Sequence, residues 1–167
     1  MKIVYYCYGS AHSSVIAAAI HLKKLPWDRI PTLAEVEIQE RFDRTENWEI
    51  GTPFFMGTDR EGNEVYTLGL GPDRIMIRRI IASLIKIWNY PAREILLVDT
   101  LVCIHCLTRI GGFLSRKLGL VTIGRPLAAL GIRLSYNRLL ELVQATIAQV
   151  QRADYTKNDT LDPIQKI

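Results

Sequence analysis

The chain has 167 residues, 49% of them hydrophobic, and a net charge of +4, which suits one compact domain and argues against disorder. No run of about 18 apolar residues occurs and the N-terminus lacks a signal-peptide pattern, so we expect a cytoplasmic protein without a membrane partner. Three cysteines, an odd number, favour a reducing compartment over a disulfide framework.

The positive charge is concentrated in the middle of the chain. Residues 71–140 hold eleven lysines and arginines against three acidic residues, a net of +8. Arginine-rich segments either bind phosphates and carboxylates or cover solvated helix faces. Because the aromatic residues are not interleaved with these cations in the pattern of a base-stacking surface, we do not expect a nucleic-acid partner.

The N-terminal 22 residues predict a strand, a small polar turn and a helix. Residues 2–8 have the composition of a strand, residues 9–14 are small or polar, and residues 15–22 suit a helix. This order of elements presents backbone N–H groups and a helix N-terminus to an anion. The segment therefore indicates an anionic ligand, without naming a reaction.

The next part of the chain predicts a short helix and a β-hairpin. Thr32 and Glu35 have the spacing of a capping box, which predicts a helix from this point to about Arg41. Residues 54–58 and 64–68 then predict two strands, and the turn between them indicates a hairpin.

Helices and strands alternate through the rest of the chain. Apolar residues at helical spacing predict helices over residues 72–89 and 106–118, with Gly119 at a C-cap, and a last helix over 135–152. The apolar run of residues 94–99 predicts a strand buried on both faces, and residues 120–124 predict a further strand.

This pattern predicts a single α/β domain over residues 1–152 with a flexible tail over 153–167. We expect a three-layer α/β/α arrangement, P-loop or Rossmann-like, with a mainly parallel sheet plus one β-hairpin. Ligands collect at the carboxyl ends of the strands in such folds. Residues 9–14, the end of strand 94–99 and residues 124–125 should therefore share one edge.

The turn after the first strand is similar to a degenerate P-loop. A standard P-loop ends Gly-Lys-Ser/Thr, where the lysine reaches phosphates and the hydroxyl holds magnesium. Here Ala11 and His12 replace the glycine and lysine, and Ser13 keeps the hydroxyl. A histidine is suited to proton transfer at neutral pH, which makes His12 a candidate catalytic residue. The candidate ligand-binding residues of the turn are Gly9, Ser10, Ser13 and Ser14.

Other residues could complete or replace this site. Asp99 ends an apolar strand, as in a Walker B motif, and is a candidate for orienting magnesium or water. Arg125 and Arg109 could contact an anion at the same edge. The alternative for the turn itself is a plain helix start capped by Ser13 or Ser14.

Cysteines offer a different chemistry. Cys7 at the end of the first strand is similar in place to the cysteine of low-molecular-weight phosphatases, but Ser13 stands where those enzymes need an arginine. A buried structural cysteine is the alternative for Cys7. A thiol or metal site could instead be built from Cys103, His105 and Cys106, although a structural zinc site needs four ligands.

Several segments together resemble a conserved bacterial family of unknown function, DUF3189. They are YYCYGSAHSSVIAAAIHL, GTDREGNEVYTLGLG and LSRKLGLVTIGRPL, and the resemblance spans about residues 1–150. It implies a bacterial cytoplasmic protein, typical of spore-forming Gram-positive bacteria, and no established activity. Its characteristic residues here would be Tyr8, Gly9, His12, Ser13, Ser14 and the Gly124-Arg125-Pro126 segment.

Three functions are therefore open. The first is binding of a small phosphorylated ligand, such as a nucleotide with magnesium, which would place any reaction among phosphoryl transfers or phosphoester hydrolyses. The second is the thiol or metal site. The third is a non-enzymatic regulatory or interaction protein with an inactive nucleotide-type fold, for which the missing P-loop lysine is the main support.

Overall fold

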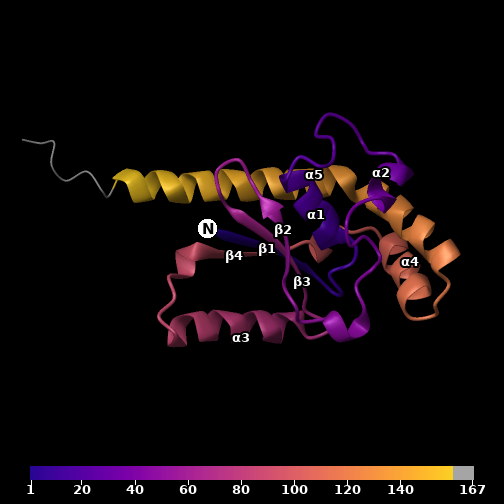
Figure 1. The fold of residues 1–167 in the computed structure, drawn as a ribbon, viewed down its shortest axis with the longest axis horizontal. Coiled ribbons are helices and arrows are strands. Elements are labelled where there is room, and N and C mark those ends of the chain that lie inside the picture. Colours follow the sequence, from indigo (N-terminus) through magenta and orange to yellow (C-terminus); the bar gives the residue numbers. More distant parts are fainter. Residues whose placement is uncertain (160–167) are drawn as a thin grey trace, which may run out of the picture.

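A four-stranded sheet with the strand order β2-β3-β1-β4 forms the centre of the protein (Figure 1). The computed structural model describes the backbone of residues 1–159 and side chains up to residue 152, so part of the expected tail, residues 160–167, lies outside the described residues. β1 runs parallel to β3 and β4, and β2 is antiparallel to β3. The strands are β1 (Lys2–Cys7), β2 (Phe54–Thr58), β3 (Glu64–Gly69) and β4 (Ile95–Asp99).

The predicted strands 2–8, 54–58, 64–68 and 94–99 and the hairpin are confirmed, so the fold is α/β with a mostly parallel sheet. Both faces of β1 are covered, because its side chains are apolar on both faces. Ile3 and Tyr5 are fully buried toward one face, and Val4 and Tyr6 are buried toward the other. Alternation along a strand places successive side chains on opposite faces, so β1 contributes to two cores.

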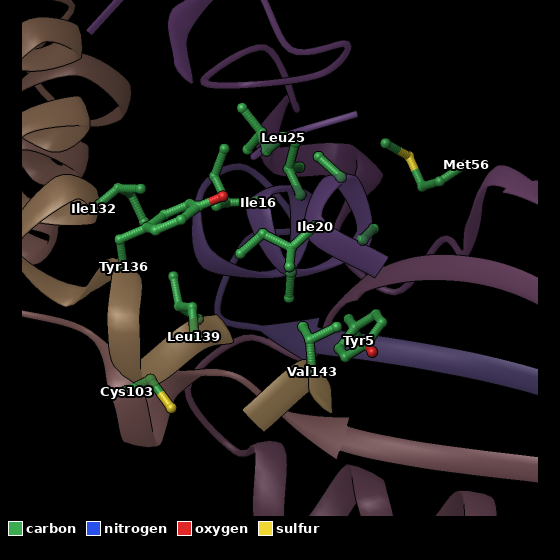
Figure 2. Close-up of a cluster of buried hydrophobic side chains, with 14 of the residues drawn as sticks. Tyr5, Ile16, Ile20, Leu25, Met56, Cys103, Ile132, Tyr136, Leu139 and Val143 are labelled. Atoms are coloured by element: carbon green, nitrogen blue, oxygen red, sulfur yellow. The ribbon is translucent and has the colours of Figure 1, made fainter. Parts of the chain in front are cut away.

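One face of the sheet is covered by α1 (Ser13–His21) and by α5 (Val121–Asp159). Every residue of α1 is buried, which its run of alanine and isoleucine allows. Figure 2 shows Ile16 and Ile20 of α1 facing Tyr136, Leu139 and other side chains of α5. This cluster is the main core of the protein.

The other face of the sheet meets α3 (Arg74–Ile87), which lies along the edge of the molecule in Figure 1. Ile77 and Ile81 of α3 are partly buried against Val4 and Tyr6 of β1. No residue of α3 is fully buried, so this second core is thin.

The C-terminal half differs from the prediction at one element. The strand expected over residues 120–124 is wrong, because α5 begins at Val121 and continues through the helix expected over 135–152 to Asp159. α4 (Cys106–Arg116) ends two residues before the predicted position, with Lys117 rather than Gly119 at its C-cap, and Gly119 turns the chain with a positive φ of 69°. The chain then returns as a helix because α5 packs closely along α4, and this tertiary contact overrides the β preference of Val121 and Ile123.

The remaining elements are short. The capping box of Thr32 and Glu35 is present, but α2 (Leu33–Glu37) ends before the expected Arg41. Three 3-10 turns complete the chain: η1 (Asn47–Glu49), η2 (Ala92–Glu94) and η3 (Leu101–Cys103). Among the described residues, no helix is both long and apolar enough to cross a membrane.

Candidate functional site

A cleft of about 500 Å³ opens at the carboxyl ends of β1 and β4, and α4 lines part of it. In the sheet, β3 lies on one side of β1 and β4, which comes later in the chain, lies on the other side. The strand order therefore reverses beside β1. Ligands of open α/β sheets bind at such a reversal. The cleft is lined by the loop after β1, by residues 45–50, by the segment after β4 and by one face of α4.

The loop after β1 presents unused hydrogen-bond donors. Within the described residues, the backbone N–H groups from Gly9 to Ser14 donate no hydrogen bond, and no side chain caps the N-terminus of α1. Gly9, Ala11, His12 and Ser13 line the cleft. Successive N–H groups at a helix N-terminus carry partial positive charge and form an anion-binding concavity. The alternative of a plain helix start capped by Ser13 or Ser14 is therefore not what the structure shows.

The serines of this loop have different surroundings. The Ser13 hydroxyl lies 2.8 Å from Thr100 Oγ1, which itself donates to the Tyr6 carbonyl, so Ser13 donates its hydrogen to Thr100. The oxygen lone pairs of Ser13 remain available. Ser14 is buried and contacts Cys7, with 3.2 Å between Oγ and Sγ. Ser10 is buried, its hydroxyl has no hydrogen-bond partner among the described residues, and neither Ser10 nor Ser14 lines the cleft.

His12 is held by a carboxylate that sequence reasoning did not single out. Its Nε2 lies 3.0 Å from Oδ1 of the buried Asp43, and its ring meets Phe42 edge to face. The lack of a side chain at Gly112 makes room for the ring, since a Cβ there would lie 2.8 Å from His12 Cε1. Because the ionised carboxylate can only accept, Nε2 donates this hydrogen bond, and Nδ1 makes no hydrogen bond with the described residues.

Asp43 connects three parts of the chain. Besides His12 it accepts hydrogen bonds from Ser115 of α4 and from Arg125 Nε of α5, the latter at 3.3 Å. Burial alone would raise the pKa of Asp43, but the hydrogen bonds from His12, Ser115 and Arg125 outweigh burial and hold this pKa below its ordinary value. Asp43 is therefore an ionised, buried carboxylate beside the cleft.

Cations outnumber acids around the cleft. Its lining includes Arg74, Arg109, Arg116 and Lys117 against a single carboxylate, Glu46. Arg116 is fixed by Glu46 and by the backbone carbonyls of residues 43 and 45. Arg109 and Lys117 make no ion pair or side-chain hydrogen bond with the described residues. The cleft thus keeps two cations available for an anionic ligand.

Besides Ser10 and Ser14, the predicted site residues Asp99 and Arg125 do not line this cleft. Asp99 lies on the α3 side of the sheet, where it pairs with Arg74 at 3.3 Å and accepts from the backbone N of Leu101. It lines a separate cavity of about 320 Å³ together with Tyr6 of β1 and with four residues of α3, which are Arg74, Ile75, Arg78 and Arg79. Arg125 belongs to α5 and does not follow a strand. Its Nε donates a hydrogen bond to Asp43. Residues 124–125 were predicted to lie at the carboxyl end of a strand, at the same edge of the sheet as residues 9–14. This prediction is wrong, because no strand ends there.

The cysteines are separated by their exposure. Cys7 lines the cleft but is buried, and Cys103 is buried with Sγ 3.5 Å from the Arg138 carbonyl. Cys106 is exposed at the start of α4, next to His105, whose ring caps that helix. Among residues 1–152, no group of three or more histidines, cysteines and acids is arranged to hold a metal ion.

This difference in exposure predicts thiol reactivity. In the native protein, Cys106 alone should react within minutes with an aromatic disulfide reagent, because burial raises the pKa of the Cys103 thiol and hides Cys7. Cys106→Ser should abolish this fast phase, as measured by absorbance, and denaturant should expose all three thiols. Two thiols reacting at the same fast rate would instead support the thiol-pair hypothesis.

Sequence reasoning missed Asp43, Thr45 and Lys117. Asp43 and Thr45 lie in a polar loop without periodicity or motif, and they reach the site because the Asp43 backbone N donates to the Ala11 carbonyl and the Thr45 hydroxyl to the Ser10 carbonyl. Lys117 follows the last residue of α4 as one of many cations. Only the abundance of lysine and arginine in residues 71–140 pointed toward it.

Comparison with known proteins identifies the family. The model of the family described as "Protein of unknown function (DUF3189)" matches residues 2–147, which is most of the chain. The chain belongs to the DUF3189 family. No curated protein and no solved structure matches it. The function of this DUF3189 protein must therefore be inferred from its own cleft.

Proposed function

We propose that this DUF3189 protein binds a phosphate-bearing ligand, a nucleotide in the first instance, in the cleft at the carboxyl end of β1. The observation that carries the proposal is the row of N–H groups from Gly9 to Ser14 that, within the described part of the chain, donate no hydrogen bond, beside two cations without an ion pair there, Arg109 and Lys117. Backbone donors at a helix N-terminus and arginine side chains are the groups that proteins use to hold phosphate.

The proposal extends to the fold. Helices on both faces of the sheet, with the cleft at the reversal of strand order, support a three-layer α/β/α arrangement of the P-loop or Rossmann kind. In that arrangement the loop of residues 9–14 takes the place of the phosphate-binding loop. Ser13, whose hydrogen is donated to Thr100, offers an oxygen lone pair to a phosphate-bound magnesium ion.

The rest of the cleft suits the other parts of a nucleotide. Tyr8 and Phe113 line it and are about half exposed, so each offers an aromatic surface to a base or sugar. His12, oriented by Asp43, lies next to the loop with one ring nitrogen free to take a proton. If the protein is an enzyme, phosphoryl transfer or phosphoester hydrolysis is the class of reaction that this arrangement serves.

A thermal-shift screen tests the proposal. Nucleotides, sugar phosphates and inorganic phosphate are each tested with and without magnesium. A ligand present at 100 times its Kd should stabilise the protein by about 2.7 kcal/mol, a rise in Tm of several degrees. The double variant Arg109→Gln/Lys117→Gln should lose this rise while its own Tm stays unchanged, because the two side chains make no contact that folding needs.

A matched control separates the effect of the two cleft cations from the effect of lower net charge on the whole protein. Arg44→Gln/Arg60→Gln removes the same charge from two exposed arginines outside the cleft and should keep the ligand-induced rise. The proposal is wrong if no compound in the panel raises the Tm of the wild type, or if the cleft variant keeps the full rise. Release of phosphate by wild type but not by His12→Ala would then distinguish an enzyme from a non-catalytic binding protein.

A further inference from the structure

The outer surface of α3 is apolar and has no partner within the described residues. Over residues 75–90 the exposed large hydrophobic residues are 41–71% accessible, values typical of surface side chains rather than of a core. Soluble proteins seldom leave such a cluster open without a use for it. The residues are Ile75, Met76, Ile80, Ile87, Trp88 and Tyr90.

The helix carries more apolar surface than the sheet covers. Ile77 and Ile81 face the sheet, whereas Met76, Ile80 and Ile87, spaced by four and seven residues, lie together on another side of the helix. The apolar surface thus extends from the sheet side around to solvent. A helix of 14 residues is about 21 Å long, so this exposed stripe runs along most of it.

Positive charge dominates beside the stripe, and one acid borders the segment at each end, Asp73 and Glu94. From residue 74 to residue 93 the chain holds five lysines and arginines and no acidic residue. Arg74 is paired with Asp99, but Arg79, Lys86 and Arg93 make no ion pair with the described residues. An exposed apolar stripe next to cations is complementary to a surface whose interior is apolar and whose outer groups are negatively charged.

We propose that α3 is a docking surface for an anionic lipid bilayer, lying in the plane of the membrane surface with Met76, Ile80 and Ile87 inserted among the lipids. Basic amphipathic helices bind in this way, by burying apolar area and by attraction to anionic headgroups. Trp88 and Tyr90 at the end of the helix suit the headgroup level, where amphipathic rings are favoured. The proposal does not depend on the ligand of the cleft.

Two structural facts favour a bilayer over a protein partner. A symmetric contact between two copies would bring the same patch against itself, and so place two sets of five cations together with Asp73 and Glu94 as the only acids that border the segment. The helix also lies along an outer edge of the molecule in Figure 1, where no other element of the ribbon separates it from a surface on that side. A helix that lies on the surface of a bilayer does not need to span it. This proposal differs from the sequence-based expectation of no membrane partner.

Vesicle binding tests the proposal. The protein is sedimented with vesicles of phosphatidylglycerol and phosphatidylcholine in equal parts, and with vesicles of phosphatidylcholine alone. Wild type should sediment with the anionic vesicles only, and less so at high salt. Arg79→Gln/Lys86→Gln should bind about 30-fold more weakly, and Ile80→Ser/Ile87→Ser should also lose binding. The charge-matched variant Arg44→Gln/Arg60→Gln should bind like wild type.

A second readout locates the contact. In a Trp48→Phe background, which removes the other strongly exposed tryptophan, emission should shift to the blue on binding because Trp88 leaves water. The proposal is overturned if wild type stays in the supernatant, or if the control variant loses as much binding as the α3 variants. It is also overturned if Ile80→Ser/Ile87→Ser abolishes a dimer seen by ultracentrifugation while wild type ignores lipid.

Discussion

Gly124→Ala should destabilise the protein by about 3 kcal/mol or more, although alanine is the better helix former. A Cβ at Gly124 would lie 2.4 Å from the backbone N of Ser115 and 2.7 Å from the carbonyl oxygen of Gly111. These are backbone atoms of α4, so no side chain can rotate away. In an exposed helix the same change would add about 1 kcal/mol of stability, and the clash reverses that sign.

Chemical and thermal unfolding measure this effect. A loss of 3 kcal/mol corresponds to a fall in Tm of roughly 6–12 °C for a domain of this size. Gly111→Ala should behave similarly, since its Cβ would lie 2.3 Å from the backbone N of Ala128. Gly9→Ala is the control, because nothing lies within 4 Å of the added Cβ, and it should stay within about 0.5 kcal/mol of wild type. Equal stabilities for Gly124→Ala and wild type would mean that α4 and α5 do not cross at these glycines.

Asp43→Ala should cost about 3–5 kcal/mol, the usual effect of removing one member of a buried charged network. The change leaves the ring of His12, the hydroxyl of Ser115 and the guanidinium of Arg125 without their shared acceptor. Asp43 also holds a left-handed backbone conformation with φ of 54°, which aspartate tolerates better than most residues do. If Asp43→Ala does not fold, Asp43→Asn keeps the shape and removes only the charge.

The contribution of Asp43 should depend on pH. Its pKa in the folded protein lies below its ordinary value of 3.8, so the stabilisation is complete above about pH 4 to 5 and is lost as the pH falls through the folded pKa. The difference in unfolding free energy between wild type and Asp43→Asn should therefore shrink below about pH 4. Asp28→Ala, at an exposed acid, is the control and should change stability little at any pH. A difference that is constant down to pH 2 would contradict the assignment of an ionised Asp43.

These two predictions concern the same part of the fold. The crossing of α4 and α5 at Gly111 and Gly124 places Ser115 and Arg125 where both can reach Asp43. Asp43 in turn orients His12 at the edge of the cleft. A loss of close packing between the two helices should therefore disturb the histidine as well as the stability.

Much of the N-terminal half could be predicted because its signals are local. The apolar residues of β1, the hairpin of β2 and β3, and the capping box of Thr32 each act over a few residues. The run of Ile95–Asp99 indicated a buried strand for the same reason. The parallel sheet then brings the loop after β1 and the segment after β4 to one edge, so part of the cleft followed from the order of elements.

The residues at 120–124 show where local preference fails. Val121 and Ile123 favour a strand in isolation, but Gly124 lets α5 approach the backbone of α4, and the helix that results buries Ala128 and Ile132 in the core. Nothing within five residues of Gly124 indicates that contact. Arg125, which was predicted to follow a strand, consequently lies in α5 and pairs with Asp43.

By itself, the sequence determined an α/β fold, a family, and a small polar loop at residues 9–14 between a strand and a helix. These features depend on residue order and short spacing. Only the tertiary structure decided which side chains meet at the cleft. Asp43 lies 31 residues from His12 and 72 from Ser115, and such contacts depend on how α4 and α5 pack. The face of β4 from which Asp99 projects was decided in the same way, since register in the sheet places it with Arg74 and away from His12.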